Sequence, residues 1–507
     1  MAELALSEIV QLGYAQRVLG DAAVRVRGVR HDSRRCEPGD LFLAVAGAQS
    51  DGAQFVEDAV ARGATAVLAE RDLSQTMSLP VPLVLADDAL IAFSRIAQTV
   101  YDDPSARMSS VGITGTNGKT TCTYLVESLL MAANEKPAVF GTVNFRGPFG
   151  VLDATHTTPM ADDMMRLARA AYESGATHMV LEVSSHALAM HRVDCVHFAV
   201  AAFTNLTQDH LDYHGDFKSY ENAKRRLFRE LSPRAAVVNV DDAVGRSIAD
   251  EFEGRVLRCA KQHGPGVDVG ALSYASDRAG IRARVSCVGQ EFELTSPLIG
   301  DHNLENLLIA IGCGAALGLH VETMQRALRD AVGAPGRLQR VAHPHDVLVF
   351  VDYAHTPDAL ARVLTAVRKN TTGRLIVTFG CGGDRDAGKR PLMGRASAEL
   401  ADIAVLTSDN PRREPPLSIL AQIEAGVTAA GMPHIAPAAL ANATRGYCVE
   451  ADRHKAIRWA LEAARPGDTV LIAGKGHEKV QIVGEQRIAF DDVVEARAVI
   501  DSLPEGS

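Results

Sequence analysis

A glycine-rich stretch in the first third of the chain combines a lysine and two threonines in a spacing suited to phosphate binding. In "SSVGITGTNGKTT", Gly115 and Gly118 precede Lys119 and Thr120, between an apolar segment and a helix-like one. Backbone N–H groups of such a loop bind phosphates, while the lysine reaches the terminal phosphates and the threonine can ligate magnesium. The usual spacing places a glycine one residue after Gly112, and a turn that only packs helix on strand is the simpler alternative. We predict a nucleotide site comprising Gly115, Thr116, Asn117, Gly118, Lys119, Thr120 and Thr121.

Carboxylates and histidines follow the next apolar segments. "MVLEVSSHAL" ends a strand-like run with Glu182, where a buried charge needs a partner such as a magnesium ion; a surface carboxylate is the alternative. The stretch "FTNLTQDHLDYHGD" then gathers Asp209, His210, Asp212 and His214. It could form a transition-metal site, a turn capped by Asp212 or Asp216, or a magnesium site. The absence of a cysteine partner favours magnesium, which takes only one or two protein ligands beside phosphates.

The stretches "LTSDNPRREPP" and "AGKGHEK" predict a binding site for a zwitterion. Pro411 stiffens the first loop, and Arg412 can offer a planar, bidentate fork to a carboxylate. In the second, Gly474 allows close backbone approach and Glu478 can accept from an ammonium group. A surface loop with solvated arginines is the alternative.

A third loop, "GCGGDRDAGKRPLMG", is similar to the glycine-rich G-x-G-x-x-G fingerprint of dinucleotide-binding loops. Its sixth position is Arg385 rather than glycine, which weakens a NAD interpretation. Pro391 is typical of a helix start, so we expect Arg390 to be free to face a ligand.

The elements that position these loops alternate strand and helix along the whole chain. Strand-like segments such as "HMVLEV", "RLIVTFG", "ADIAVLTSD" and "DTVLIAGKG" each end in a polar or glycine-rich loop, as in parallel sheets whose carboxyl ends bind ligands. The length of 507 residues predicts about three domains. We place them at residues 1–107, 108–337 and 338–507.

Composition excludes several classes of protein. The formal charge of −10 disfavours nonspecific nucleic-acid binding. The eight scattered cysteines include no CxxC pair, which indicates reduced thiols and makes a structural zinc site improbable. The acidic start "MAELALSEIV" and the lack of a long apolar run predict a cytoplasmic chain without membrane insertion.

"TGTNGKTT" and the segment over residues 203–228 resemble the ATP loop and the magnesium signature of the Mur ligases, which use ATP to join amino acids onto the cell-wall precursor. The resemblance runs from Asp32 to Glu478. It implies an α/β fold of three domains: an N-terminal UDP-substrate-binding domain, a central P-loop ATPase-like domain with a parallel sheet, and a C-terminal Rossmann-like domain. It also implies that His210 is a metal ligand and that Lys224 is carbamylated, because a carbamate offers oxygen ligands where an ammonium repels magnesium. An ordinary exposed Lys224 is the alternative.

The resemblance also assigns site residues. Further nucleotide contacts fall on Asn303, Asn306, Arg337, Asp352 and His355, which would otherwise be helix-start polar residues or a linker cation. Contacts to a UDP-muramoyl-dipeptide fall on Ser33, Ala48, Gln49, Ser50, His156, Thr157, Thr158, Ser184, Met190 and Arg192, although "HDSRRCEPGD" could be turn chemistry. His156 and Met190 depart from the family pattern, which commonly has asparagine and glutamine there. Diaminopimelate contacts fall on Arg390, Asp409, Asn410, Pro411, Arg412, Gly474 and Glu478. Metal ligands fall on Thr120, Glu182, His210 and Lys224, and catalytic roles on Lys119, His210 and Lys224.

The implied reaction is an ATP-dependent amide-bond formation in peptidoglycan precursor synthesis. ATP phosphorylates the D-glutamate carboxylate of UDP-N-acetylmuramoyl-L-alanyl-D-glutamate, and the amine of meso-diaminopimelate attacks the acyl phosphate. The resemblance further implies magnesium as cofactor, closure of the domains around the intermediate, and a monomer. Arg412 would pair with the far carboxylate that lysine lacks. The alternatives are a lysine-adding Mur ligase, a folylpolyglutamate synthetase and a P-loop switch ATPase that acts by binding a partner.

Overall fold

The computed structural model describes residues 3–47, 50–207 and 211–503. The chain divides into two compact units. The first comprises Met1–Ser273, Arg284–Glu293 and Glu305–Leu328, and the second Tyr274–Ala283, Leu294–Leu304 and Arg329–Ser507. Both are α/β, which confirms the predicted fold class. The three domain boundaries given above stay predictions. None of the helices in the described ranges is both long and apolar enough to cross a membrane.

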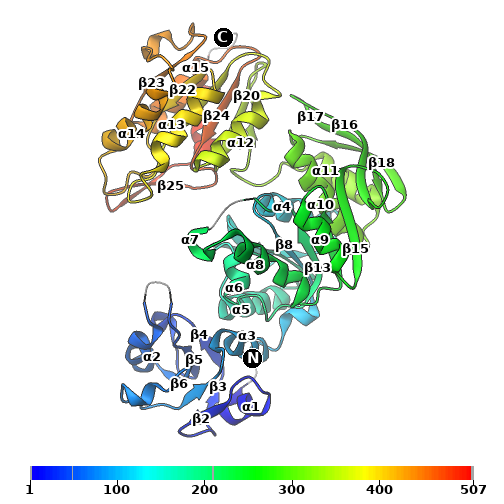
Figure 1. Ribbon diagram of the computed structural model, residues 1–507, viewed down its shortest axis with the longest axis vertical. Helices are drawn as coiled ribbons and strands as arrows, with labels where there is room; N and C mark the ends of the chain where they lie inside the picture. Colours follow the sequence, from blue (N-terminus) through cyan, green and yellow to red (C-terminus); the bar gives the residue numbers. More distant parts are fainter. Residues whose placement is uncertain (1–2, 48–49, 208–210, 504–507) are drawn as a thin grey trace. The chain divides into compact units, whose positions relative to one another are not determined.

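The N-terminal part of the first unit is a five-stranded sheet with helices on both faces (Figure 1). In sheet order its strands are β2 (Arg17–Leu19), β7 (Leu83–Leu85), β6 (Ala64–Ala69), β5 (Asp40–Leu43) and β4 (Gly28–Arg30). A small ladder joins β1 (Leu4–Ala5) to β3 (Arg25–Val26), and the helices are α1 (Leu6–Gln11), α2 (Val56–Ala61) and α3 (Ala89–Val100). Alternate residues of β6 face opposite ways: Val67 packs in the core that contains α2, and Leu68 in the core that contains α3.

The central sheet has eleven strands in the order β11-β10-β9-β12-β8-β13-β14-β15-β16-β17-β18. Their bounds are β8 (Ser109–Thr114), β9 (Pro137–Phe140), β10 (Asn144–Gly147), β11 (Gly150–Asp153), β12 (His178–Glu182), β13 (Phe198–Phe203), β14 (Ala235–Asn239), β15 (Arg255–Gln262), β16 (Val269–Asp277), β17 (Gly280–Cys287) and β18 (Gln290–Ser296). The strands from β9 to β16 in this order pair in parallel, so the carboxyl ends of β8, β12 and β13 share one edge. The phosphate-binding sequence follows β8, and Glu182 is the last residue of β12.

The helices between and after these strands are α4 (Lys119–Ala132), α5 (Ala161–Glu173), α6 (Ser185–Ala189), α7 (Leu211–His214), α8 (Phe217–Arg229), α9 (Ala243–Glu251), α10 (Asp301–Ala316) and α11 (Val321–Arg329). Helix α4 starts directly after the glycine-rich loop, with Gly118 as its N-cap. Helix α8 starts at an N-cap aspartate, Asp216, whose carboxylate accepts from Ser219 N at 2.7 Å. The cap at Asp216, one of the alternatives for this stretch, is therefore present.

The second unit contains a six-stranded sheet in the order β19-β20-β24-β21-β22-β23, parallel except for β19. Its strands are β19 (Gln339–Val341), β20 (Leu348–Asp352), β21 (Leu375–Phe379), β22 (Ile403–Leu406), β23 (Gly446–Val449) and β24 (Thr469–Ala473), with a hairpin of β25 (Val480–Val483) and β26 (Gln486–Ala489). The helices are α12 (Pro357–Arg368), α13 (Lys389–Leu400), α14 (Pro416–Ala429), α15 (Arg453–Glu462) and α16 (Asp492–Asp501).

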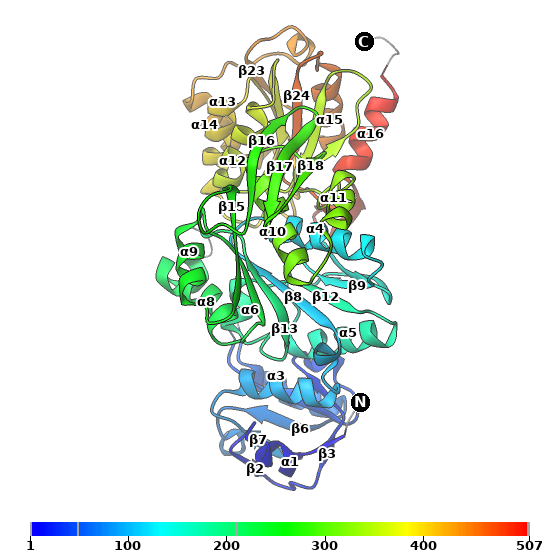
Figure 2. The ribbon, with the colours of Figure 1, turned by 90° about the vertical axis from the view of Figure 1, so that its right-hand side faces the viewer.

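Two separate cores cover the two faces of this sheet. Phe350 lies in the core with α12, α13 and α14, and its neighbour Val351 lies in the core with α15 and α16. Figure 2 shows α14 and α16 on opposite sides of the sheet. A sheet buried on both faces gives the continuous apolar runs seen in the sequence, and its carboxyl end is the place for ligand-binding loops.

Candidate active site

The phosphate loop, residues 115–121, has the backbone that its glycines predict. Gly115 and Gly118 have φ angles of 146° and 88°, which favour glycine. A Cβ on Gly115 would collide with Thr204 Oγ1, and one on Gly118 with Asn306 Oδ1. Lys119 Nζ donates to the carbonyl oxygens of Gly115 and Thr116, both at 2.9 Å. The loop therefore packs closely against Thr204 and Asn306 and carries a half-buried lysine, and its role in phosphate binding stays a prediction.

A second lysine reaches the same loop from α8. Lys224 is only 1% exposed, and its Nζ donates to Gly115 O at 2.7 Å and lies 4.6 Å from the centre of the Tyr220 ring. The alternative of an ordinary exposed lysine is thus wrong. Since Lys119 and Lys224 both donate to one carbonyl oxygen, positive charge is concentrated at the loop, as an anionic ligand requires.

Glu182 ends β12 beside the first turn of α4. It is 1% exposed, so the alternative of a surface carboxylate is also wrong. Its oxygens accept from Thr120 Oγ1 at 2.8 Å, from Thr142 N at 2.8 Å and from Thr142 Oγ1 at 3.1 Å. A buried carboxylate next to a threonine hydroxyl is a hard oxygen donor set that fits magnesium. His210 and Asp209 lie outside the described residues, as do Ala48 and Gln49.

The residues expected to contact the muramoyl-dipeptide gather beside Glu182. Thr158 Oγ1 donates to Glu182 O at 2.7 Å and accepts from Ser184 N at 3.1 Å, and Thr157 Oγ1 lies 3.1 Å from Thr142 Oγ1. Arg192 is held by Thr158 O at 3.2 Å.

Arg192 is the member of this group that has a buried hydrogen-bond donor left over for a ligand. Its Nη2 lies 3.1 Å from Met190 Sδ, its Nε is buried without a hydrogen-bond partner among the described residues, and burial lowers its pKa. A half-buried cation with a spare donor is suited to an anionic substrate group. His156 is largely exposed to solvent. Partial burial of its imidazole, and then the charges of Arg192 and His31, lower its pKa.

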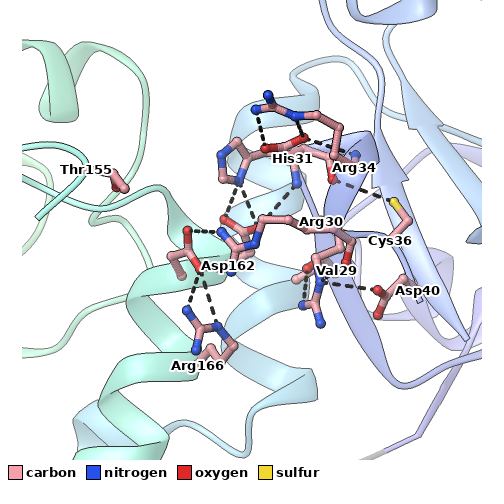
Figure 3. Close-up of polar contacts among 12 residues, drawn as sticks. Val29, Arg30, His31, Arg34, Cys36, Asp40, Thr155, Asp162 and Arg166 are labelled. Carbon is pink, nitrogen blue, oxygen red and sulfur yellow. Dashed lines mark hydrogen bonds and ion pairs between the residues drawn. The ribbon is translucent and has the colours of Figure 1, made fainter. Parts of the chain in front are cut away.

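The uridine side was expected at Ser33, which lies 6% exposed in a 3-10 turn, Ser33–Arg35; Ser50 is exposed. Two unexpected contacts join this turn and the residues just before it to α5. His31 Nδ1 lies 2.9 Å from both carboxylate oxygens of Asp162, and Figure 3 shows the two side chains facing each other. Arg35 makes a bidentate pair with Asp163, at 2.7 and 2.8 Å. Nothing in the sequence connects these positions, so only the structure could find them.

His31, Asp162 and Asp163 lie close enough together to resemble a metal site. Their acidic groups are engaged, however: Asp162 bonds the histidine, and Asp163 also accepts from Arg166 at 2.8 Å. The cluster is an ion-pair network between the N-terminal sheet and α5.

The acceptor loop, residues 408–412, follows β22 at the carboxyl end of the second unit's sheet. Arg412 has a left-handed backbone, with φ of 52°, and is held by the hairpin strand β25: its N donates to Ile482 O at 3.0 Å, and Gly484 N donates to its carbonyl at 2.7 Å. Its half-buried guanidinium donates from Nη1 to Gly383 O at 2.8 Å. Among the described residues this is its one side-chain hydrogen bond, so the remaining edge of the fork is available to a carboxylate.

Asn410, Glu478 and Lys475 form the rest of this site. Asn410 Nδ2 donates to Glu478 Oε2 at 2.8 Å, and the fully buried Lys475 donates to Glu478 Oε2 at 3.0 Å and to Asn410 Oδ1 at 3.2 Å. Glu478 thus accepts from the chain's own Lys475, and its contact with a ligand ammonium stays a prediction. Burial raises the pKa of Asp409, against the opposing charges of Arg453 and Lys475. Gly474 has φ of 114°, and a Cβ there would come within 2.9 Å of Asp409 Oδ2.

Arg390 is not free to face a ligand, which corrects the expectation drawn from Pro391. Helix α13 begins at Lys389, and the Arg390 side chain is 1% exposed. Its Nη1 and Nη2 bond the two oxygens of Glu414 at 2.9 and 2.8 Å, and this pairing lowers the pKa of Glu414 to about 2. The sequence analysis did not single out Glu414, the carboxylate that pairs with Arg390 and follows the acceptor loop in the chain.

Three of the remaining nucleotide candidates, Arg337, Asp352 and His355, lie near β20 within the second unit, and the other two lie on α10. Asp352 accepts from Leu338 N at 2.6 Å and Ala354 N at 2.8 Å, and burial raises its pKa. The Arg337 guanidinium lies 5.0 Å from the Tyr353 ring centre, and its Nε is buried without a hydrogen-bond partner among the described residues. His355 Nδ1 lies 2.8 Å from Tyr353 O. On α10, Asn303 Nδ2 donates to Ile299 O at 2.9 Å, and Asn306 lies against Gly118 as described above.

Comparisons with known proteins identify the family to which the chain belongs. Three family models match: the Mur ligase family catalytic domain over residues 25–100, the Mur ligase middle domain over residues 113–314, and the Mur ligase glutamate ligase domain over residues 336–476. The chain belongs to the Mur ligase family, as the sequence motifs predicted.

Two relatives and one solved structure that share a name are similar over nearly the full chain. UDP-N-acetylmuramoyl-L-alanyl-D-glutamate--2,6-diaminopimelate ligase of Synechococcus elongatus is 46% identical over 484 residues, covering 94% of each chain. The ligase of the same name from Geobacter metallireducens is 41% identical over 493 residues, covering 96% of each. A solved structure with that name has a TM-score of 0.70 and 33% identity, covering 99% of each chain.

Proposed function

We propose that this chain is an ATP-dependent ligase that joins meso-2,6-diaminopimelate to the D-glutamate of UDP-N-acetylmuramoyl-L-alanyl-D-glutamate. A carboxylate oxygen of the glutamate attacks the γ-phosphorus of ATP, which releases ADP and leaves an acyl phosphate. The amine of diaminopimelate then attacks the acyl carbon, and phosphate and a proton leave as the amide forms. Full-length similarity to relatives of that name supports the reaction, and the fork of Arg412 carries the choice of amino acid.

The phosphate loop binds and orients ATP. Its N–H groups and Lys119 bind the phosphate oxygens, and Lys119 shifts from its own loop carbonyls toward the negative charge. We assign Asn303, Asn306, Arg337, Asp352 and His355 as further nucleotide contacts. The spare Nε of Arg337 supports this assignment.

Magnesium is the cofactor we expect, and Thr120 and Glu182, together with His210 and a carbamylated Lys224, would hold it. The adjacent hydroxyl and buried carboxylate support this assignment. Bound there, magnesium neutralises charge on phosphate oxygens. Unmodified, the Lys224 ammonium adds to the positive charge at the loop; as a carbamate it would supply oxygen ligands instead.

The nucleotide-sugar substrate is expected at Ser33 and residues 48–50 for the uridine end and at a second group for the dipeptide end. That second group is His156, Thr157, Thr158, Ser184, Met190 and Arg192. The spare donor of Arg192, close to Thr158 and Glu182, supports binding of the glutamate carboxylate near the phosphate loop.

The amino acid is expected at Asp409, Asn410, Pro411, Arg412, Gly474 and Glu478, whereas Arg390 is paired with Glu414 and is left out of these contacts. Arg412 pairs with the far carboxylate, and Glu478, oriented by Asn410, accepts a hydrogen bond from the far ammonium. L-Lysine offers no carboxylate at that end, so it leaves the fork of Arg412 without its partner. We further propose that the chain works in the cytoplasm, where its substrates are made, and as a monomer.

The test is phosphate release from ATP and UDP-N-acetylmuramoyl-L-alanyl-D-glutamate with meso-diaminopimelate, with L-lysine or with no amino acid, combined with the mass of the product. We expect phosphate and a tripeptide product with diaminopimelate only. Equal turnover with lysine would overturn the role of Arg412. ATP hydrolysis without an amide product, or no turnover with either amino acid, would overturn the ligase assignment.

A further inference from the structure

An ion pair lies beneath the loops assigned to the amino acid, with both side chains 0% exposed. Arg453 is the first residue of α15, and Asp492 is the first residue of α16. Arg453 Nε donates to Asp492 Oδ1 at 2.8 Å, and Nη2 donates to Asp492 Oδ2 at 2.7 Å. Burying two charges costs several kcal/mol in desolvation, so such a pair is weak support for stability alone. Its other contacts indicate what else it does.

The same guanidinium reaches the ends of two strands. Nη2 donates to Ala473 O at 3.0 Å, at the end of β24, and Nη1 donates to Ser408 O at 3.3 Å, in the loop after β22. The residue after each carbonyl, Gly474 or Asp409, is an assigned amino-acid contact. One planar group therefore orients both peptide planes.

The peptide plane between Ala473 and Gly474 is held at its N–H as well as at its carbonyl. Gly474 N donates to Asp352 O at 3.1 Å, so the unit between Ala473 and Gly474 is fixed at both its carbonyl and its N–H. Rotation of this plane would move Gly474 relative to the Asp409 carboxylate, which lies against it. The positions of the two loops are thus coupled through Arg453.

We propose that Arg453, oriented by Asp492, is a positioning residue for the incoming amino acid: it fixes the loops after β22 and β24 so that their groups converge on one ligand. This inference rests on the proposed function. Lysine would keep the positive charge but not the planar fork that bonds a carboxylate and two carbonyls together.

A matched control exists at the opposite end of the same sheet. Arg374 and Asp468 are 12% and 4% exposed and are bonded at 2.7 Å. Arg374 also donates to Leu440 O at 2.9 Å and Ala463 O at 2.6 Å. Asp468 directly precedes β24, so this pair braces the amino end of the strand whose carboxyl end Arg453 braces. No assigned ligand contact adjoins it.

The experiment compares Arg453→Lys, Asp492→Glu and Arg374→Lys with the wild type in the full chain. Melting temperature is measured, together with KM for meso-diaminopimelate, ATP and the UDP-dipeptide, well below each melting point. We expect Arg453→Lys and Asp492→Glu to raise KM for the amino acid at least about tenfold, with the other two KM values within about threefold. Arg374→Lys lowers the melting temperature comparably and leaves all three KM values within about threefold.

The inference is overturned if KM for the amino acid is unchanged in the folded Arg453 and Asp492 variants, or if Arg374→Lys raises it equally. It is also overturned if neither variant folds while Arg374→Lys does, because the pair is then a folding determinant. Failure of the proposed function gives a different result: the wild type itself forms no amide with any of the amino acids.

Discussion

The phosphate loop and the acceptor loop each follow a buried parallel strand and present a cation, but they obtain their shapes in different ways. In the phosphate loop the left-handed residues are Gly115 and Gly118, and Lys119 bonds carbonyls of its own loop. In the acceptor loop the left-handed residue is Arg412 itself, at a cost of about 1 kcal/mol.

The acceptor loop is held in that shape from outside. Strand β25 bonds the Arg412 backbone, Lys475 bonds Asn410, and Arg453 bonds Ser408 O. Remote residues also bond the phosphate loop, since Lys224 donates to Gly115 O and Thr116 N donates to Asn205 O. The difference lies in the left-handed positions, which glycines occupy without strain in the phosphate loop and an arginine occupies in the acceptor loop. A change within the first loop should affect chemistry more than stability, and a change beneath the second should affect both.

Replacing Lys119 is the strongest way to test the first half of this comparison. Lys119→Met removes the cation that we propose meets the phosphoryl group but leaves the glycine backbone, so we expect kcat to fall about a thousandfold. The melting temperature should stay within about 2 °C of the wild type. Steady-state kinetics and thermal unfolding measure both, with Lys218→Met, a lysine 70% exposed, as control. A large loss of stability would show that the loop depends on the lysine for its shape.

Glu182→Gln asks whether the phosphate loop also depends on a remote strand end. The amide keeps a hydrogen-bond acceptor for Thr120 or Thr142 but removes the charge, so we expect about a hundredfold loss of turnover that is partly restored by added magnesium. Glu127→Gln is the matched control, since Glu127 pairs with Arg146 on the same domain. A lower melting temperature with unchanged magnesium dependence would make Glu182 a structural acceptor only.

Lys475→Met tests the second half of the comparison. The change leaves Glu478, Asn410 and the Val480 carbonyl without their buried ammonium. We expect a lower melting temperature together with a KM for diaminopimelate about tenfold higher, while KM for ATP is unchanged. A pure kcat loss without any change in stability, as for Lys119, would remove the distinction between the loops.

The smallest effect is expected where neither loop is involved, at the contact between His31 and Asp162. Burial lowers the pKa of His31, but the hydrogen bond and charge of Asp162 outweigh it and raise the pKa above 6.5. The stabilisation is therefore complete below the unfolded-state pKa and is lost as pH rises through the folded-state value. Asp162→Asn should lower the melting temperature by about 2–4 °C near pH 6 and by less near pH 9.

The neighbouring pair provides the control for this titration. Burial raises the pKa of Asp163, but bonds from Arg35 and Arg166 outweigh it and lower the pKa to about 2. Its stabilisation is lost only as pH falls through that value, so the effect of Asp163→Asn should be equal near pH 6 and near pH 9. Equal pH dependence of the two variants would contradict the assignment of the titration to His31.

The same contrast explains what the sequence could predict. The strands, the parallel sheets and the phosphate loop follow from local patterns, namely buried apolar runs and glycines before a helix. Those patterns also placed Glu182 and Arg412 at the carboxyl ends of strands, where the structure has them.

Long-range partners were not predictable in this way. Arg390 was expected to be free because no local pattern assigns Glu414 to it, and Arg453, Asp492 and Lys475 were not singled out. Buried charges are paired across the fold, and a single sequence contains no record of which charges meet. Family resemblance supplied residues such as Asn306, whose position against Gly118 no periodicity indicates.

The central claim is that the fork of Arg412 selects the amino acid by its far carboxylate. Arg412→Asn tests it most directly, because asparagine tolerates the left-handed backbone while the fork is lost. The measurement is the ratio of kcat/KM for meso-diaminopimelate to that for L-lysine. We predict that this ratio falls about a hundredfold in the variant, since only diaminopimelate loses a charge-assisted pair. A ratio within about threefold of the wild-type value would contradict the account.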